Sequence, residues 1–343
     1  MKKKIRIAQI GVNRYSHATD IFRTLMNLSD EFEIVGYALV EDERETCAKK
    51  LKCFEGYREM TVEEILNDPT IDAVAVETDE IHLNKYAQMV ADAGKHMHME
   101  KPGSQDLASF EKLVETVKRN QTVFHIGYMY RYNSFIADAI ARAKAGEFGD
   151  IYCVEAHMSR YDKDDCREWF SSFKGGMMFY LGVHLVDLVL QIQGEPTEVI
   201  PLNTITGLHG IETEDLGFAV LKYPHATSVI RMGGTEVGGY KRRQLVICGD
   251  RHTVEICPLE ETPTVKTLNT VSELLTRKKE YVLDEEGHVK TVSAESEHFG
   301  RYDAMMRAFA AMVRGEKQNP YTYDYELQLF RLILKCCGVD VKA

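Results

Sequence analysis

Short apolar segments alternate with amphipathic segments along the N-terminal part of the chain, and this alternation constrains the fold more than any other feature. Apolar runs of strand length, separated by stretches with helical periodicity, are typical of repeated βαβ units. We therefore expect an α/β fold of the Rossmann type, with a doubly wound parallel sheet and right-handed crossovers. The expected strands cover residues 5–10, 33–40, 71–77 and 95–101, and the expected helices cover 19–27 and a segment ending at Gly94.

The carboxyl ends of these strands are where we expect a ligand to bind. Gly11, Leu39, Thr78 and Lys101 each lie at such an end. Because the carboxyl ends of parallel strands meet at one edge of a sheet, the four residues should lie near one cleft. We include Thr78 among the expected cofactor-binding residues for this reason.

The turn after the first strand partly matches a dinucleotide-binding fingerprint. Of the three glycines of G-x-G-x-x-G, only Gly11 is present, while Asn13 and Ser16 occupy the other two positions, with Arg14 between them. Asparagine tolerates a left-handed backbone, and serine is small and offers a hydroxyl for a phosphate or a helix N-cap. We expect these residues to bind a pyrophosphate at the helix N-terminus. An ordinary turn between strand and helix is the alternative.

The second strand should end beside the adenosine ribose of a dinucleotide. The position at which an acid is expected is Leu39, and Glu41 and Asp42 follow just beyond it. A carboxylate that reached the ribose would repel the additional phosphate of NADP. We therefore expect NAD rather than NADP, with Glu41 as the cofactor-binding acid; a solvated acidic loop is the alternative.

The stretch from Gly94 to Gly103 is the most plausible location of the chemistry. Lys101 ends a buried strand, and Pro102 cannot continue the ladder, so the chain turns where the ammonium group projects. A partly buried ammonium can exchange protons near neutral pH, whereas a lysine that only extends into water would not. His96, His98 and Glu100 share the other strand face, but no complete metal-ligand set is evident and we assign no metal.

Composition excludes several classes of partner. The formal net charge is −11 and the pI is about 5.6, so nucleic acid and anionic membrane surfaces should be repelled. The eight cysteines form no C-x-x-C pair, which fits reduced thiols in a cytoplasm. No uncharged apolar run approaches the roughly 18 to 20 residues of a membrane span.

The remainder of the chain predicts a second domain with an open, mostly antiparallel sheet. Strands are expected at 199–205, 215–223, 226–232, 243–248, 252–257 and 278–283. We set the dinucleotide-binding domain at 1–124 and a substrate-binding and oligomerisation domain at 125–343. Val229, Leu245 and Ile247 should cover the free face of this sheet by pairing with a second subunit, so we expect a homo-oligomer, either a dimer or a tetramer.

A polar stripe lies on an otherwise apolar helix expected over residues 181–193. His184, Asp187 and Gln191 follow one another at helical intervals, and buried polar groups need partners. Asp187 could fix the position of His184 from one turn away. A satisfied core histidine is the alternative.

Two residues outside this helix are also substrate-site candidates. Arg131 can bind a hydroxylated substrate or pair with a carboxylate of the protein. Trp169, the only tryptophan, is either core packing or a wall for a sugar ring.

Several motifs together resemble the Gfo/Idh/MocA oxidoreductases, the relatives of glucose-fructose oxidoreductase and inositol dehydrogenase. They are Gly11 after the first strand, A-G-K-H at 93–96 with E-K-P at 100–102, G-Y-M-Y-R-Y-N at 127–133, and G-V-H-L-V-D at 182–187. The resemblance implies hydride transfer between a nicotinamide cofactor and a hydroxyl carbon of a sugar, polyol or glycoside. It implies that Lys101 and Glu100 lie at the cofactor and that Lys101 donates a hydrogen bond to the reacting oxygen. It also implies that His184 orients the substrate or relays its proton.

The sequence departs from the family pattern at three places. Tyr180 stands where the family usually has an aspartate, four residues before His184, so Tyr180 could carry the proton, bind substrate or only fill space. The ribose acid is displaced, and Thr78-Asp79-Glu80 replaces T-P-N. Two alternatives to a dehydrogenase therefore stay open: a redox-assisted glycoside hydrolase or lyase with tightly bound NAD, and a non-catalytic nucleotide-dependent sugar sensor.

Overall fold

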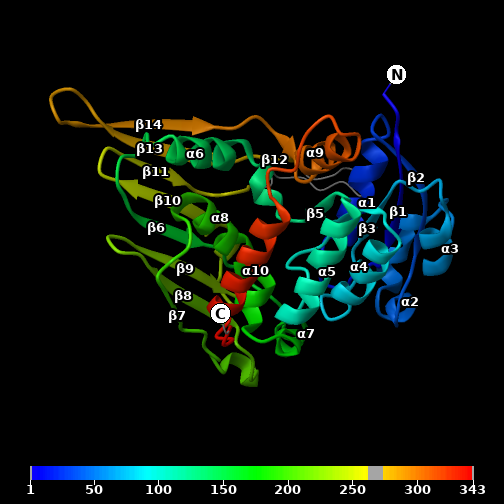
Figure 1. Cartoon of the computed structure of the whole chain (residues 1–343). Coiled ribbons are helices and arrows are strands. Elements are labelled where there is room, and N and C mark those ends of the chain that lie inside the picture. Colours follow the sequence, from blue (N-terminus) through cyan, green and yellow to red (C-terminus); the bar gives the residue numbers. More distant parts are fainter. Residues whose placement is uncertain (1, 262–272, 342–343) are drawn as a thin grey trace. The chain divides into compact units, whose positions relative to one another are not determined.

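The computed structural model of the chain describes residues 2–261 and 273–341 (Figure 1). Two compact units make up the chain. The first comprises Met1–Gly127 and Tyr302–Gln328, and the second comprises Tyr128–Arg301 and Leu329–Ala343. Across the described residues, no helix combines the length and the apolar character needed to cross a bilayer.

The grouping of Tyr302–Gln328 with the first unit differs from the domain division expected from the sequence. The segment belongs there because its side chains contact the last strand of the first sheet. Phe309 stacks on His125 with ring centroids 5.3 Å apart. Asn319 Nδ2 donates a 2.8 Å hydrogen bond to the carbonyl of Phe124. A segment distant in sequence thus completes the N-terminal unit.

The first unit is a parallel five-stranded sheet with strand order β2-β1-β3-β4-β5. This order reverses direction between β1 and β3, which makes that point the place where a ligand binds in folds of this class. Its strands are β1 (Ile5–Ile10), β2 (Phe32–Ala38), β3 (Ala73–Val76), β4 (His96–Met99) and β5 (Phe124–Ile126). Its helices are α1 (Ala18–Asn27), α2 (Glu43–Thr46), α3 (Val62–Asn67), α4 (Leu83–Asp92), α5 (Leu107–Asn120) and α9 (Asp303–Val313).

Local sequence signals explain several boundaries in this unit. The backbone N–H of Glu64 donates to Thr61 Oγ1 at 3.0 Å, and the N–H of Thr61 donates to Glu64 Oε2 at 2.7 Å, which forms the capping box at the start of α3. The four residues of β3 are all buried, as expected for a central strand of a parallel sheet covered on both faces. Together with the matching strand order, these features confirm the α/β fold class predicted from the sequence.

The second unit contains an eight-stranded sheet with order β14-β13-β11-β10-β6-β9-β8-β7, in which only the β6–β9 pair is parallel. This confirms the predicted open, mostly antiparallel sheet. The strands are β6 (Ile151–His157), β7 (Glu198–Pro201), β8 (Leu216–Lys222), β9 (Thr227–Gly233), β10 (Gln244–Gly249), β11 (His252–Ile256), β13 (Arg277–Leu283) and β14 (Val289–Glu295). A separate two-stranded sheet joins β12 (Glu273–Leu274) to β15 (Phe299–Gly300).

Helices of the second unit cover one face of its large sheet. The helices of this unit are α6 (Ser134–Lys144), α7 (Asp164–Trp169) and α8 (Val183–Gln193), while α10 (Tyr323–Cys336) begins in the first unit and ends in the second. Figure 1 shows α6 and α8 running along the sheet. Leu245 and Ile247 are fully buried on the covered face, opposite Ala156 and Val154, so they do not lie on the free face as the sequence analysis expected. Strand alternation puts Val246 and Cys248 on the free face instead.

Candidate active site

The first turn of the nucleotide-binding unit is shaped by a glycine that no other residue could replace. Gly11 has φ +92°, and a Cβ on it would lie 2.6 Å from the side chain of Thr78 and 2.7 Å from its backbone. The turn therefore passes directly against the end of β3, beside the point where the strand order reverses. Gly11 and Thr78 lie together as the sequence predicted, and the close approach leaves the backbone accessible to a pyrophosphate.

Asn13 holds this turn through its side chain. It is not among the described residues with a positive φ, so the tolerance of asparagine for a left-handed backbone is not used at this position. Instead, Asn13 Oδ1 accepts hydrogen bonds from the backbone N–H groups of Tyr15 at 2.8 Å and Ser16 at 3.3 Å. Asn13 Nδ2 donates to Glu80 Oε2 at 2.6 Å. Arg14 is exposed in the same turn, where its guanidinium lies over the ring of Tyr15.

Two residues that the sequence analysis did not single out also fix the turn. Lys50 Nζ donates to the carbonyl oxygens of Asn13 at 2.7 Å and Ser16 at 3.0 Å. The buried carboxylate of Glu43 accepts from the backbone N–H of Val12 and from that of Val40, both at 3.0 Å. Burial raises the pKa of Glu43 to about 7, although both backbone hydrogen bonds favour its charged form.

The acid expected at the ribose is already engaged by the protein. Glu41 follows β2 with φ +50°, and its Oε1 accepts hydrogen bonds from Lys85 Nζ at 2.7 Å and Tyr86 Oη at 2.8 Å. The hydrogen bonds from Lys85 and Tyr86 lower the pKa of Glu41. A negative charge therefore stands beyond the end of β2, with a cation of α4 beside it.

Lys101 lies among buried carboxylates just after β4. Its Nζ is 3.2 Å from Glu100 Oε1 and 3.5 Å from Glu80 Oε1, and Lys101 is only 6% exposed. Burial raises the pKa of Glu80 to about 7, an effect that the charge of Lys101 opposes. Since Glu80 also accepts from Asn13, one carboxylate joins the nucleotide turn to the lysine that the sequence predicted to be catalytic.

A buried acid and two histidines continue from this cluster. Glu77 follows β3 directly, is fully buried, and places Oε1 3.5 Å from His98 Nε2. His98 Nδ1 lies 2.7 Å from His125 Nδ1, which requires one ring to donate and the other to accept. Burial raises the pKa of Glu77 well above its ordinary value and lowers that of His98 to about 3. His98 is therefore neutral near neutral pH, and burial favours the neutral form of Glu77.

In the second unit, Arg131 and Asp187 are turned towards each other. Arg131 Nε donates to Asp187 Oδ2 at 3.0 Å, and Nη2 donates to Oδ1 at 2.8 Å, in a bidentate pair with both side chains about 1% exposed. Gln191 Nε2 donates to the same carboxylate at 3.0 Å. Of the two alternatives for Arg131, the structure shows pairing with a carboxylate of the protein. The pair fixes the position of α8 and acts as a brace for it. The Asp187 carboxylate binds Arg131 in this pair. The contact does not provide the support for His184 that was expected from the sequence.

His184 lies in an aromatic setting on α8. The rings of Tyr128 and Tyr130 approach it edge-on, with centroids 5.9 Å and 5.3 Å from that of the imidazole. His184 is 7% exposed, so the imidazole is largely withdrawn from bulk water. Its position near the start of the helix places it one turn after Tyr180.

Tyr180 precedes α8 in a π-helical turn, Met178–Gly182, which the sequence analysis expected to be ordinary α-helix from residue 181. Such turns are frequent at functional sites. Trp169 meets the ring of Tyr180 edge-on at 5.2 Å and that of Phe173 at 4.7 Å, so it is part of an aromatic cluster and half-buried. Arg160 Nη1 donates to Tyr180 Oη at 3.1 Å.

Comparison with known proteins decides the family. Residues 5–128 match the family model described as an oxidoreductase family with an NAD-binding Rossmann fold, GFO_IDH_MocA. Residues 136–255 match the model of the GFO/IDH/MocA C-terminal domain. The chain belongs to the Gfo/Idh/MocA oxidoreductase family. This Gfo/Idh/MocA protein is accordingly an NAD(P)-dependent dehydrogenase.

Relatives of this Gfo/Idh/MocA protein differ in cofactor. The scyllo-inositol 2-dehydrogenase (NADP(+)) IolW of Bacillus subtilis (strain 168) is 22% identical over 71% of this chain and 68% of its own length. The scyllo-inositol 2-dehydrogenase (NAD(+)) of the same organism is 27% identical over 57% of this chain and 55% of its own length. A solved structure, levoglucosan dehydrogenase in complex with NADH and L-sorbose, has a TM-score of 0.76 at 16% identity and covers 98% of this chain and 96% of that one.

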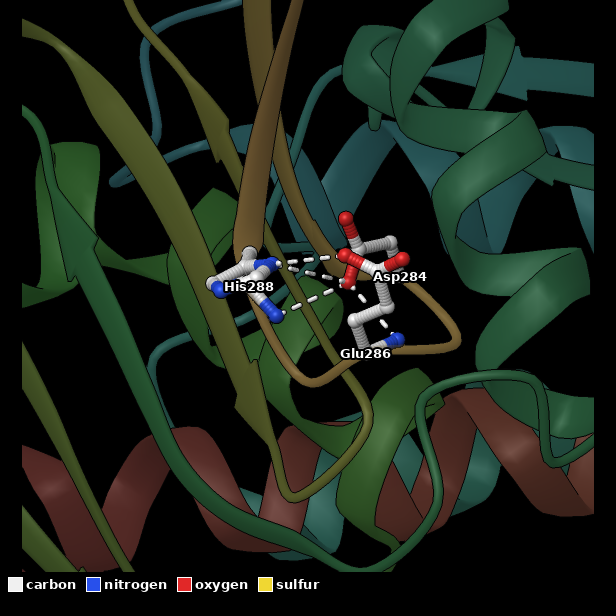
Figure 2. A group of neighbouring side chains, drawn as sticks. All are labelled: Asp284, Glu286 and His288. Carbon is white, nitrogen blue, oxygen red and sulfur yellow. Dashed lines mark hydrogen bonds and ion pairs between the residues drawn. The ribbon is translucent and has the colours of Figure 1, made fainter.

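One cluster of this Gfo/Idh/MocA protein has the spacing of a metal site without lying at the candidate active site. Among the described residues, Asp284, Glu286 and His288 place ligand atoms within 4.8 Å of one another (Figure 2). They form the turn between β13 and β14, where Asp284 Oδ1 accepts from the backbone N–H groups of Glu286 at 3.0 Å and His288 at 2.8 Å. The Asp284 carboxylate therefore serves the turn, while Glu286 and His288 are exposed.

Two of the three polar residues predicted to share one strand face, His96 and His98, contact other groups of the protein. His96 Nδ1 accepts from the backbone N–H of Val123 at 3.0 Å, and His98 faces His125 and Glu77.

Proposed function

We propose that this protein oxidises a hydroxyl carbon of a sugar or cyclic polyol, with NAD as hydride acceptor. The position of Lys101 carries the proposal: a lysine with little exposure follows β4 of the nucleotide-binding sheet, and Glu80 joins it to the turn expected to hold the pyrophosphate. Relatives named for inositol oxidation support a polyhydroxylated substrate. No observation favours a glycoside hydrolase or a sensor over a dehydrogenase.

Lys101 would bind the oxygen of the reacting hydroxyl. An ammonium group offers donors only, so it holds an oxygen and stabilises negative charge as the proton leaves. Glu100 and Glu80, at 3.2 Å and 3.5 Å, limit where that ammonium can lie. Bound NAD supplies the hydride acceptor. The contribution of the chain is to orient the C–H bond and to receive the hydroxyl proton.

His184 and Tyr180 are the proposed proton carriers. An imidazole exchanges protons near neutral pH, and a phenol can do so when its environment favours the phenolate. Trp169 would provide an apolar wall beside Tyr180, since their rings are 5.2 Å apart. Arg131 and Asp187 would act on the site only by fixing α8.

The preference for NAD would come from Glu41. Its carboxylate opposes a second negative charge near the end of β2, and Lys85 is already bound to it. Gly11, Asn13, Arg14, Ser16 and Thr78 would form the pyrophosphate site.

We also propose that a second copy of the chain covers the free face of the large sheet. Leu283 of β13 and its partner Val289 of β14 are each more than half exposed, and strand alternation puts them on that face. Light scattering would test this: a dimer or tetramer is expected, and a monomer at working concentrations would contradict it.

The function is tested with purified protein, NAD and a panel of inositols, sugars and glycosides, with the absorbance of NADH as the signal. Lys101→Met should abolish the activity that is found while nucleotide binding stays close to that of the wild type. Lys95→Met is the matched control, because Lys95 is a buried lysine just before β4 whose ammonium donates to the backbone carbonyls of Asp68 and Ile71. Full activity in Lys101→Met would refute the assignment.

A further inference from the structure

An arginine and an aspartate that follow β6 are held beside Tyr180 by the backbone. The N–H of Arg160 donates to the carbonyl of Gly233 at 2.9 Å, and the N–H of Asp162 donates to that of Gly234 at 2.7 Å. The segment is therefore extended, and its alternate residues share a face. Tyr161, between the two, is 62% exposed, whereas Asp162 is 7% exposed.

Arg160 connects a carboxylate to a phenol. Its Nε lies 2.5 Å from Asp162 Oδ1, and its Nη1 donates to Tyr180 Oη at 3.1 Å. A guanidinium has no acceptor, so the phenol oxygen must accept this hydrogen bond. Asp162 Oδ2 is buried with no hydrogen-bond partner among the described residues, and Arg160 is thus the main compensation for this carboxylate.

We propose that Arg160 is a positioning residue that stabilises the phenolate of Tyr180, with Asp162 restraining the effect, so that Tyr180 receives the hydroxyl proton of the substrate. This inference rests on the proposed function. In the reaction, the O–H bond of the substrate breaks and its proton joins Tyr180 Oη, while the C–H bond breaks and its electron pair leaves as hydride to NAD. The products are a carbonyl compound, NADH and a neutral phenol.

The charges act in opposite directions in this arrangement. An adjacent cation favours the charged form of a phenol, and an adjacent carboxylate disfavours it. Burial works against the charge of Arg160, but Tyr180 and Asp162 outweigh it and raise the pKa of the guanidinium. Burial raises the pKa of Asp162, and Arg160 opposes that rise. The guanidinium is therefore a permanent cation that both groups share.

Arg160 is a cation that contacts the phenol of Tyr180 directly in the described structure. From α7, Cys166 lies near Arg160, and the ring of Trp169 meets that of Tyr180 edge-on. Arg167 of the same helix is taken up by Asp215, to which Nη2 donates at 2.6 Å. On the helix of Tyr180 itself, His184 is the next titratable group, one turn later.

The test places 3-fluorotyrosine at position 180 of the full chain and follows its ionisation by fluorine NMR, which requires no substrate. Arg160→Met should move the midpoint to higher pH by about one to three units. Asp162→Asn should move it to lower pH, and Arg160→Lys should restore part of the loss. Arg277→Met is the control, because Arg277 is exposed and pairs only with Glu261 and Glu295 among the described residues.

Opposite shifts are the decisive result, because loss of folding or packing would not move one titration in two directions. The pH profile of kcat/KM should shift in the same directions in the two variants. Midpoints that stay in place, that move together, or that move without the pH profile would overturn this proposal. A wild-type protein that oxidises none of the polyols would instead refute the proposed function, and this is visible before any variant is made.

Discussion

Glu41 Oε1 accepts a 2.7 Å hydrogen bond from Lys85 Nζ, which joins the end of β2 to α4. The acid that should discriminate between the two nicotinamide cofactors is thus paired with a cation that could bind the additional phosphate of NADP. The balance between these two residues, and not the presence of an acid alone, should set the preference.

Glu41→Ala should therefore shift the preference towards NADP. Removal of the carboxylate eliminates the repulsion and leaves Lys85 available to a phosphate. We expect the ratio of kcat/KM for NADP to that for NAD to rise by about tenfold, equivalent to about 1.4 kcal/mol. The double variant Glu41→Ala/Lys85→Met should lose most of this gain. An unchanged ratio in the single variant would remove Glu41 from the cofactor site.

Lys101→Met should lower kcat by about 10² to 10⁴, the range of a positioned proton-transfer or charge-stabilising group. The substitution keeps a long apolar stem but removes the ammonium that lies near Glu80 and Glu100. The NAD dissociation constant, measured by calorimetry, should change little. A loss confined to KM with kcat unchanged would show that Lys101 only binds substrate.

Glu77→Gln should flatten the dependence of stability on pH. Burial raises the pKa of Glu77 in the folded state above its unfolded value. Folded protein consequently holds more protons than unfolded protein above the unfolded pKa, and stability falls as pH rises from there to the folded pKa. One such proton changes the free energy of unfolding by at most about 1.4 kcal/mol per pH unit. The lowered pKa of His98 adds a slope of opposite sign below pH 6.5, because only the unfolded histidine binds a proton there; this contribution is common to the wild type and the variant.

Urea denaturation across pH 5 to 8 measures how the free energy of unfolding depends on pH. This range of about three pH units is enough to resolve a slope of one proton. The variant should gain on the wild type as pH rises, since glutamine replaces a neutral acid without a charge to lose. The exposed Glu63→Gln should follow the wild type. A Glu77→Gln curve parallel to that of the wild type would mean that the folded state holds no extra proton on Glu77 in this range.

Arg131→Met should destabilise the second unit by about 3 to 5 kcal/mol, because it leaves the carboxylate of Asp187 buried and uncompensated. The double variant Arg131→Met/Asp187→Leu should be more stable than the single variant, since it removes both charges. Chemical denaturation measures both. Lys222→Met, which breaks an exposed pair with Glu198, should cost no more than about 1 kcal/mol. If the single and double variants lost the same free energy of unfolding, the ion pair would not be what stabilises the position of α8.

The sequence by itself determined the order and type of most elements, because hydrophobic periodicity and turn residues act locally. The apolar runs gave the parallel sheet, and the E-K-P and G-V-H-L-V-D motifs located Lys101 and His184. Gly11 was recognisable because a positive φ in a tight turn demands glycine.

Only the tertiary structure decided which side chains compensate one another. Glu77, Glu80 and His98 form a buried cluster because strands that are distant in sequence end side by side, and no local pattern records that proximity. Arg160 meets Tyr180 for the same reason, across a β-strand and a π-helical turn. Charge partners are set by three-dimensional distance, whereas periodicity encodes only which face of an element is buried.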